Sequence, residues 1–368
     1  MGLRVLIVDD SLLFRKILSD VLARISDVEI VGNAPNGKIA LEKTELLNPD
    51  LITLDMEMPE MNGLQFYTEL RKKRTSPGVI VLSAINPAGD NLSMKTLELG
   101  AFDFVPKPVT ESMEESKNVL FSSLQPVIQA FIQRLGIRSL LGSAQTPAKQ
   151  VSTPDVSHEV LPPTLYPPRD LKCWGKADLI VIGISTGGPL ALHKIFSTIR
   201  VPLSVPLLIV QHIPPSFSQA LAESLREKHQ LSISEAINGE LLESGKVYLA
   251  PGGKHMKIGK DPALGLFRIF VTNDHPENNC RPSIDYLLRS IALYYPGKTA
   301  VFIMTGMGND GATGAGLIRR GGGLIVAQDE KSSVVFGMPK AVFETGVVDA
   351  VISLDLIPKK IQELAGDR

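Results

Sequence analysis

Short, wholly apolar runs are the feature that most constrains the fold of this chain. They recur through both halves of the sequence, and segments long enough for a helix separate them. An apolar run of roughly four to eight residues bounded by Gly, Pro or Asp is typical of a strand buried on both faces. Strands of this kind that alternate with helices form parallel sheets through right-handed crossovers. The pattern therefore predicts an α/β protein.

In the first half, five apolar runs predict a small doubly wound domain. Apolar residues at helical spacing fill the gaps, as in the segment from Leu12 to Leu22. A further helix is expected from Glu114 to Leu135, with a kink at Pro126. The expected strands are Leu3–Val8, Val28–Val31, Leu51–Leu54, Val79–Leu82 and Phe102–Val105.

The second half begins after a change in composition. Residues 136–176 are rich in Pro and Ser and predict an extended linker, so the expected domains are 1–135 and 177–368. The stretch from Ile233 to Thr272 has glycine turns and no clear helix, which favours an antiparallel addition to a second, mostly parallel sheet. The expected strands are Leu179–Ile184, Leu207–Val210, Val247–Ala250, Phe267–Val271, Ala300–Met304, Leu324–Ala327 and Ala350–Ile352. The expected helices are Leu190–Ile199, Phe217–Glu227, Ser283–Tyr294 and Gly311–Arg320.

Composition excludes several classes of protein. The formal net charge of −1 gives no basic footprint for nucleic acid. Cys173 and Cys280 are the only cysteines, too few for a disulfide framework or a cysteine-based zinc site. The N-terminal apolar run ends in two aspartates, unlike a signal peptide, and no apolar stretch approaches the ~18 residues of a membrane span. We expect a cytoplasmic protein that does not insert into a membrane.

Polar residues follow four of the five strands expected in the first half. Asp9 and Asp10 follow the first strand, Asp55 ends the third, Ser83 ends the fourth and Lys107 follows the fifth. Clustered carboxylates repel one another unless a cation lies among them, and Mg²⁺ with its oxygen ligands fits that place. A carboxylate beside the ion can attack a phosphoryl group, and a serine and a lysine can bind the phosphate oxygens. Each residue alone is also compatible with an ordinary polar strand end.

Together these residues and their neighbours resemble the receiver domain of two-component response regulators. The matching segments are VDDS at Val8–Ser11, LDMEMPEMNG at Leu54–Gly63, Ser83, and FVPKP at Phe104–Pro108. The resemblance implies a flavodoxin-like (βα)5 fold in which Asp55 accepts phosphate from a sensor histidine kinase. It implies that Mg²⁺ is held by Asp10, Asp55, Asp9 through water, and the backbone carbonyl of Glu57. It also implies that Phe104 moves with Ser83 on phosphorylation, with Lys107 completing the switch.

A serine, a histidine and an aspartate follow three apolar runs of the second half. Ser185 follows LIVIGI within GISTGG, His212 follows LLIVQ, and Asp310 lies in TGMGNDGATG. Ligands bind outside the carboxyl ends of parallel strands, so these side chains are expected at one edge, as the parts of a hydrolytic triad. Taken singly, GISTGG also suits phosphate binding, His212 suits an ordinary surface or core position, and Asp310 suits a helix N-cap.

The second half closely resembles the protein-glutamate methylesterase family of bacterial chemotaxis. The matching segments are GISTGGP at Gly183–Pro189, QHIPPSF at Gln211–Phe217, LAPGGKHM at Leu249–Met256, RPSID at Arg281–Asp285, and TGMGNDGATG at Thr305–Gly314. The resemblance implies Ser185 as nucleophile, His212 as base and then acid, and Asp310 as the residue that orients His212. The oxyanion donors are expected to be two backbone N–H groups. The resemblance to the family implies that of Met307, and the position directly after the nucleophile suggests that of Thr186. His255 and Arg281 suit either the cleft or a structural role, and the long Pro-rich linker departs from the family.

The expected function is a phosphorylation-activated esterase that removes methyl groups from glutamate methyl esters on chemoreceptor helices and releases methanol. Deamidation of receptor glutamines is expected as a second activity, and no cofactor is expected in the catalytic domain. One alternative is a non-enzymatic signalling adaptor with a vestigial triad, although all three triad residues are present. Another is a dinucleotide-binding enzyme built on GISTGG, but QHIPP stands where that site needs an acidic residue after the next strand.

Overall fold

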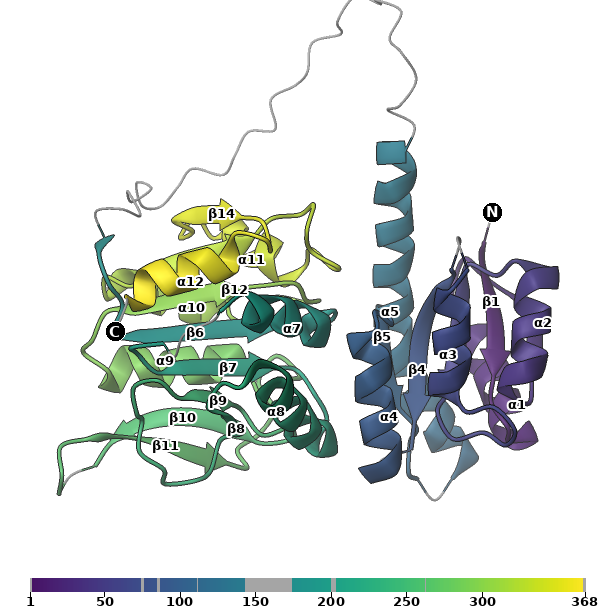
Figure 1. Cartoon of the computed structure of the whole chain (residues 1–368), viewed down its shortest axis with the longest axis horizontal. Coiled ribbons are helices and arrows are strands. Elements are labelled where there is room, and N and C mark those ends of the chain that lie inside the picture. The colour runs from purple at the N-terminus through teal and green to yellow at the C-terminus, as the bar shows by residue number, and fades with distance from the viewer. Residues whose placement is uncertain are drawn as a thin grey trace, which may run out of the picture.

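The computed structural model describes two α/β units, each a parallel sheet flanked by helices, and one long helix ends the first unit (Figure 1). It describes residues 2–73, 76–84, 87–110, 112–142, 174–199, 203–261 and 263–366. Most of the expected linker, 136–176, therefore lies outside the described residues, and the division of the chain into domains stays a prediction. None of the described helices combines the length and the apolar character needed to cross a membrane.

The first sheet has five parallel strands in the order β2-β1-β3-β4-β5, which is the flavodoxin-like order and confirms the expected fold. Its strands are β1 (Leu3–Val8), β2 (Val28–Ala34), β3 (Leu51–Asp55), β4 (Gly78–Ser83) and β5 (Asp103–Pro106). Its helices are α1 (Leu12–Leu22), α2 (Gly37–Leu47), α3 (Gly63–Arg71), α4 (Pro87–Glu98) and α5 (Met113–Gly142). The last helix continues through Pro126 and ends later than expected.

Local sequence explains where the first helices begin. Ser11 and Asn36 cap α1 and α2 by accepting hydrogen bonds from backbone N–H groups of the first turn. Asn62 and Gln65 form a capping box at the start of α3. The α1 helix then buries the apolar stripe that includes Leu18 against the sheet, so its polar N-terminus lies beside the carboxyl end of β1.

The second sheet has seven strands in the order β14-β13-β12-β6-β7-β9-β8, and all of its pairs are parallel. Its strands are β6 (Leu179–Ile184), β7 (Leu207–Gln211), β8 (Ile233–Glu235), β9 (Val247–Leu249), β12 (Thr299–Ile303), β13 (Leu324–Gln328) and β14 (Ala350–Ile352). The antiparallel addition is confirmed as the separate pair β10 (His255–Lys260) and β11 (Phe267–Thr272). The sequence did not predict β8, which has only three residues, or β10, which is interrupted by lysines and a glycine.

Helices cover both faces of the second sheet, as expected for a doubly wound fold. Alternate residues of β6 point to opposite cores: Ile182 packs on the side of α7 and α8, and Val181 packs on the side of α9 and α10. The helices are α7 (Gly188–Thr198), α8 (Pro215–His229), α9 (Ile284–Tyr294), α10 (Ala312–Arg320), α11 (Met338–Glu344) and α12 (Ile357–Ala365). The last two were not predicted, although α12 buries an apolar stripe at helical spacing.

Candidate active site and acidic pocket

Ser185 lies on the sharp turn between β6 and α7 and is half-buried. Gly187 in this turn has a φ of 77°, and a Cβ there would lie 2.5 Å from Val334, so a larger residue does not fit. A Cβ at Gly306 would lie 2.6 Å from the Ser185 Cβ. The loop after β12 therefore closes directly over the serine because its residue at this point is glycine.

Gln211 fixes Ser185 and His212 to each other through their backbones. Ile184 and Gln211 are register partners in β6 and β7, so Ser185 and His212 follow neighbouring strands, whose usual spacing is about 4.8 Å. The buried Gln211 side chain donates from Nε2 to the carbonyl oxygens of both Ser185 and His212, at 3.0 Å each. Gln211 stands in the QHIPP motif, but its sequence position alone predicts no role for it.

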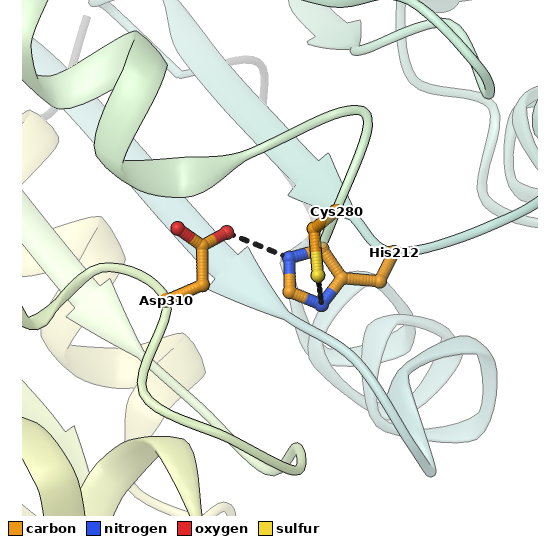
Figure 2. Close-up of side chains that lie close together, drawn as sticks. All are labelled: His212, Cys280 and Asp310. Carbon is orange, nitrogen blue, oxygen red and sulfur yellow. Dashed lines mark hydrogen bonds and ion pairs between the residues drawn. The ribbon is translucent and has the colours of Figure 1, made fainter. Parts of the chain in front are cut away.

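The structure brings His212 and Asp310 together (Figure 2): the Nε2 atom of the ring lies 2.8 Å from Asp310 Oδ2. Asp310 is 2% exposed and accepts further hydrogen bonds from Ser283 Oγ, Asn278 Nδ2 and the first backbone N–H groups of α9. Burial raises the pKa of Asp310, but His212 and these backbone donors more than offset that effect and lower it to about 2. Asp310 is therefore an ionised partner that fixes the ring of His212.

The other ring nitrogen of His212, Nδ1, faces Cys280 Sγ at 3.7 Å (Figure 2). Burial alone would lower the pKa of His212, but the hydrogen bond to Asp310 and then the contact with Cys280 raise it to about 9. Within the described residues, no hydrogen bond joins the Ser185 hydroxyl to this ring. Because Asp310 occupies Nε2, Nδ1 is the ring nitrogen that faces away from the carboxylate.

The two expected oxyanion donors lie beside Ser185, at the contact with the first sheet. The N–H groups of Thr186 and Met307 donate to no acceptor among the described residues. The Thr186 hydroxyl donates to Asp103 Oδ2 of β5 at 2.6 Å, and Met307 packs against the core that contains α1 and α5. Burial raises the pKa of Asp103 to about 6, with Thr186 opposing the rise.

A second contact between the two halves surrounds Glu98 at the end of α4, which packs against α7 and α8. His193 Nε2 lies 2.9 Å from Glu98 Oε1, and Ser224 and Lys228 both donate to the same carboxylate. At the start of α8, Phe217 stacks on Phe104 of β5, with ring centroids 4.4 Å apart. Glu98 and Asp103 were not predicted from the sequence, because neither stands in a motif.

The acidic pocket of the first sheet forms at the edge where the sequence placed it. Ligand oxygens of Asp9, Asp10 and Asp55 lie within 4.8 Å of one another. Lys107 Nζ lies 2.8 Å from carboxylate oxygens of both Asp9 and Asp55. Burial raises the pKa of Asp55 to about 6, with Lys107 opposing and Asp9 adding to the rise, and burial also raises the pKa of Asp9. The raised pKa values show that the single charge of Lys107 does not compensate the burial of these carboxylates. A divalent cation would supply the missing positive charge, and the hard oxygen donors fit Mg²⁺.

Ser83 and Glu57 complete the surroundings of Asp55. Ser83 is buried at the end of β4, and its carbonyl accepts from the Lys107 N–H at 2.8 Å. The Glu57 N–H donates to Asp55 Oδ1 at 3.4 Å, which places the Glu57 backbone beside the carboxylate. Asp9, Asp10, Lys107 and the Glu57 backbone therefore lie around Asp55, and Ser83 ends the neighbouring strand.

His255 and Arg281 have structural partners. His255 is fully buried, stacks on Tyr286 with ring centroids 4.2 Å apart, and lies with Nε2 3.0 Å from the His275 carbonyl. Arg281 Nη1 donates to the carbonyl oxygens of Asn273 and Asp274, at 3.2 Å each. Both residues therefore hold the segment before α9 in place.

Two family models match the chain in the order of its two sheets. Residues 5–115 match "Response regulator receiver domain", and residues 180–361 match "CheB methylesterase". The fold and the matches define a response regulator whose second domain is of the methylesterase type.

Similar proteins cover nearly the whole chain. A "Protein-glutamate methylesterase/protein-glutamine glutaminase" of Desulfotalea psychrophila is 45% identical over 98% of this chain and 98% of its own. A relative with the same name, numbered 2, from Koribacter versatilis is 39% identical over 97% of this chain and 94% of its own. The crystal structure of the Thermotoga maritima CheB methylesterase catalytic domain is 39% identical, covers 50% of this chain and 97% of that one, and has a TM-score of 0.48. The chain belongs to the protein-glutamate methylesterase/protein-glutamine glutaminase family.

Proposed function

We propose that this chain hydrolyses glutamate methyl esters on the cytoplasmic helices of chemoreceptors, and deamidates glutamines there, when its receiver is phosphorylated. The observation that carries the proposal is the pair of His212 and Asp310, 2.8 Å apart, beside the Ser185 turn on three neighbouring strands, β12, β6 and β7. Family membership supplies the ester and amide as substrates. In the proposed division, 1–135 is the receiver, 136–176 the linker and 177–368 the catalytic domain.

The proposed reaction uses Ser185 as the nucleophile. Its oxygen attacks the ester carbonyl carbon while its proton passes to His212 Nδ1, and the oxyanion forms beside the N–H groups of Thr186 and Met307. His212 then gives the proton to the leaving methoxide, and methanol departs. Water attacks the acyl-enzyme in the same way, and the free glutamate side chain leaves Ser185. With a glutamine substrate, ammonia leaves in place of methanol.

Asp310 has the role of fixing the ring of His212. Its carboxylate holds the proton of Nε2 and so leaves the lone pair of neutral His212 on Nδ1. It also stabilises the imidazolium that forms when Ser185 attacks. The five donors around Asp310 keep it ionised and in place through both steps.

The proposed switch is the acidic pocket of the receiver. Asp10 and Asp55, with Asp9 through water and the Glu57 carbonyl, would hold Mg²⁺, which neutralises charge when phosphate is transferred to Asp55 from a sensor histidine kinase. Ser83 and Lys107 would bind the phosphate oxygens, and Phe104 would change its packing. In the resting protein Asp103 and Phe104 touch Thr186 and Phe217, so the receiver lies on the catalytic turn and hinders a bulky helical substrate.

The test compares Ser185→Ala with Ser197→Ala, an exposed serine on the helix that follows the same turn. Methanol release from methylated receptor and labelling by a fluorophosphonate are measured in the presence of a small phosphodonor and Mg²⁺. Ser185→Ala is expected to lose both signals with its thermal stability unchanged, and Ser197→Ala to keep both. Retention of more than a few per cent of activity in Ser185→Ala would remove Ser185 from this role, and loss of labelling with intact methanol release would argue for a different nucleophile.

A further inference from the structure

The side of His212 that faces away from Asp310 is occupied by a residue that the proposed reaction does not use. Cys280 is half-buried and places Sγ 3.7 Å from His212 Nδ1 (Figure 2). His212, Cys280 and Asp310 form a group whose ligand atoms lie within 4.8 Å of one another. The residues come from three separate segments, the end of β7, the segment before α9 and the loop after β12, so the fold brings them together.

The distance between the two atoms has the value that a shared metal ion requires. A tetrahedral Zn²⁺ lies about 2.1 Å from an imidazole nitrogen and about 2.3 Å from a thiolate sulfur, which puts the two ligand atoms about 3.6 Å apart. The observed separation of Nδ1 and Sγ is 3.7 Å. The two atoms are therefore already as far apart as a shared ion would place them, a separation that an S–H···N contact also has.

Asp310 supplies the outer partner that a metal-binding histidine needs. Histidine ligands of zinc usually donate their second N–H to a carboxylate or carbonyl, which fixes the tautomer and strengthens the ligand. His212 Nε2 lies 2.8 Å from Asp310 Oδ2, while Nδ1 faces the thiol. Asp310 lies on the far side of the ring, so it orients His212 and is not itself a ligand in this arrangement. Two cysteines in the chain are too few for a zinc site held by several cysteines, whereas this site needs only one.

We propose that His212 and Cys280 form an inhibitory site for a borderline or soft divalent cation, with Zn²⁺ as the ligand and Cd²⁺ as its probe. On binding, the thiol releases its proton to solvent, as does Nδ1 where it is protonated, and bonds form from the metal to Sγ and Nδ1. Water completes the coordination. The metal then holds the lone pair that has to accept the Ser185 proton, so hydrolysis stops. Thiolate ligands select such an ion over Mg²⁺, which belongs in the oxygen-lined receiver pocket.

The binding test uses the full chain carrying Cys173→Ala, so that Cys280 is its only cysteine. The protein is stripped of metal, supplied with excess Mg²⁺ and titrated with Cd²⁺, and the ultraviolet charge-transfer band of a Cd–thiolate bond is recorded. We expect a saturable one-to-one signal that Cys280→Ser abolishes and that His212→Gln weakens at least tenfold. Cd²⁺ is also expected to protect the Cys280 thiol from alkylation. This measurement leaves both His212 and Cys280 unsubstituted, so it does not depend on the folding of a variant. A band of equal affinity in His212→Gln, or no saturable band at all, would overturn the site.

A second test measures inhibition. Inhibition rests on the function proposed above, whereas metal binding does not, so the two tests can fail separately. Zn²⁺ is expected to lower methanol release at least tenfold, a chelator to restore it, and Cys280→Ser to resist Zn²⁺ relative to its own metal-free rate. Binding of Cd²⁺ without loss of hydrolysis would overturn the inhibitory role. Ser185→Ala is expected to give the full Cd–thiolate band with no hydrolysis, and hydrolysis by that variant would remove Ser185 as the nucleophile. If the metal-free, phosphorylated chain with Ser185 intact gives the full Cd–thiolate band and hydrolyses no ester, the function proposed above fails while the metal site stands.

Discussion

Neutralising Glu98 is expected to release the catalytic turn from the resting receiver. The Glu98 carboxylate is 7% exposed and is bound by His193, Ser224 and Lys228 of the facing helices α7 and α8. Burial raises its pKa, but these three partners lower it to about 2. Because that pKa lies below its ordinary value of 4.5, the contact is at full strength above about pH 4.5 and weakens only as the pH falls toward 2. The titration of Glu98 should therefore cause no change in resting inhibition near neutral pH.

The size of the effect follows from the same contacts. A shift from 4.5 to about 2 corresponds to about 3 kcal/mol in favour of the charged carboxylate. Lys228 is half exposed, so solvent screens part of that energy, and the loss of a charged hydrogen-bonding partner is worth about 2 kcal/mol. Glu98→Gln should therefore shift the equilibrium between closed and open forms roughly 30-fold toward the open form.

The assay is methanol release from methylated receptor by the intact, unphosphorylated chain. We expect Glu98→Gln to raise this rate by up to roughly 30-fold, limited by the rate of the phosphorylated chain. The rate of the phosphorylated chain itself should stay nearly unchanged. Glu227→Gln, the same change at an exposed glutamate of α8, is the control and should stay at the resting rate. A resting rate in Glu98→Gln equal to that of the control, with both proteins folded, would refute the role of Glu98 in closing the receiver on the active site.

Three further predictions concern the two sites. Asp310→Asn should lower kcat by orders of magnitude but less than Ser185→Ala does, because the substitution disturbs the tautomer and charge of His212 while the nucleophile stays; full activity of this variant would leave Asp310 as a helix-capping residue only. His212 must be neutral to accept a proton, and its pKa is raised to about 9, so the rate measured with a chelator should rise with pH to a midpoint near 9. Cys280→Ser should move that midpoint to lower pH, because the contact with Cys280 contributes to the raised pKa. An unmoved midpoint would show that Cys280 does not act on the base. Asp55→Asn, or removal of Mg²⁺, should abolish the rise in rate that a small phosphodonor produces, and a phosphodonor response that survives Asp55→Asn would show that Asp55 is not the switch.

The sequence predicted the parts of the fold that depend on local pattern. The buried strands were found because apolar runs such as LIVIGI have one compatible structure, and Ser185, His212 and Asp55 were placed at strand ends for the same reason. The edge strand β8 was missed because its three residues are too few to show a pattern. The β10 strand was missed because lysines and a glycine interrupt its apolar residues. Polar contacts between distant segments had no local signal at all. Asn278, Ser283 and Cys280 reach the His212–Asp310 pair from a segment without regular structure, and Glu98 finds its partners more than 90 residues further along the chain.

The β5 strand places both ends of the proposed switch on one rigid element. Lys107, directly after β5, bridges Asp9 and Asp55, while Asp103 at the start of β5 accepts a hydrogen bond from Thr186 beside Ser185. Lys107 lies four positions after Asp103 in extended chain, about 13 Å away at the usual rise per residue. A phosphoryl group on Asp55 adds roughly two negative charges that compete for Lys107, and Phe104, whose side chain already packs on the second domain, lies next to Asp103. A small displacement of β5 would therefore act on the Thr186 contact and the Phe217 contact together, so phosphorylation can change access to Ser185 without a rearrangement of either sheet.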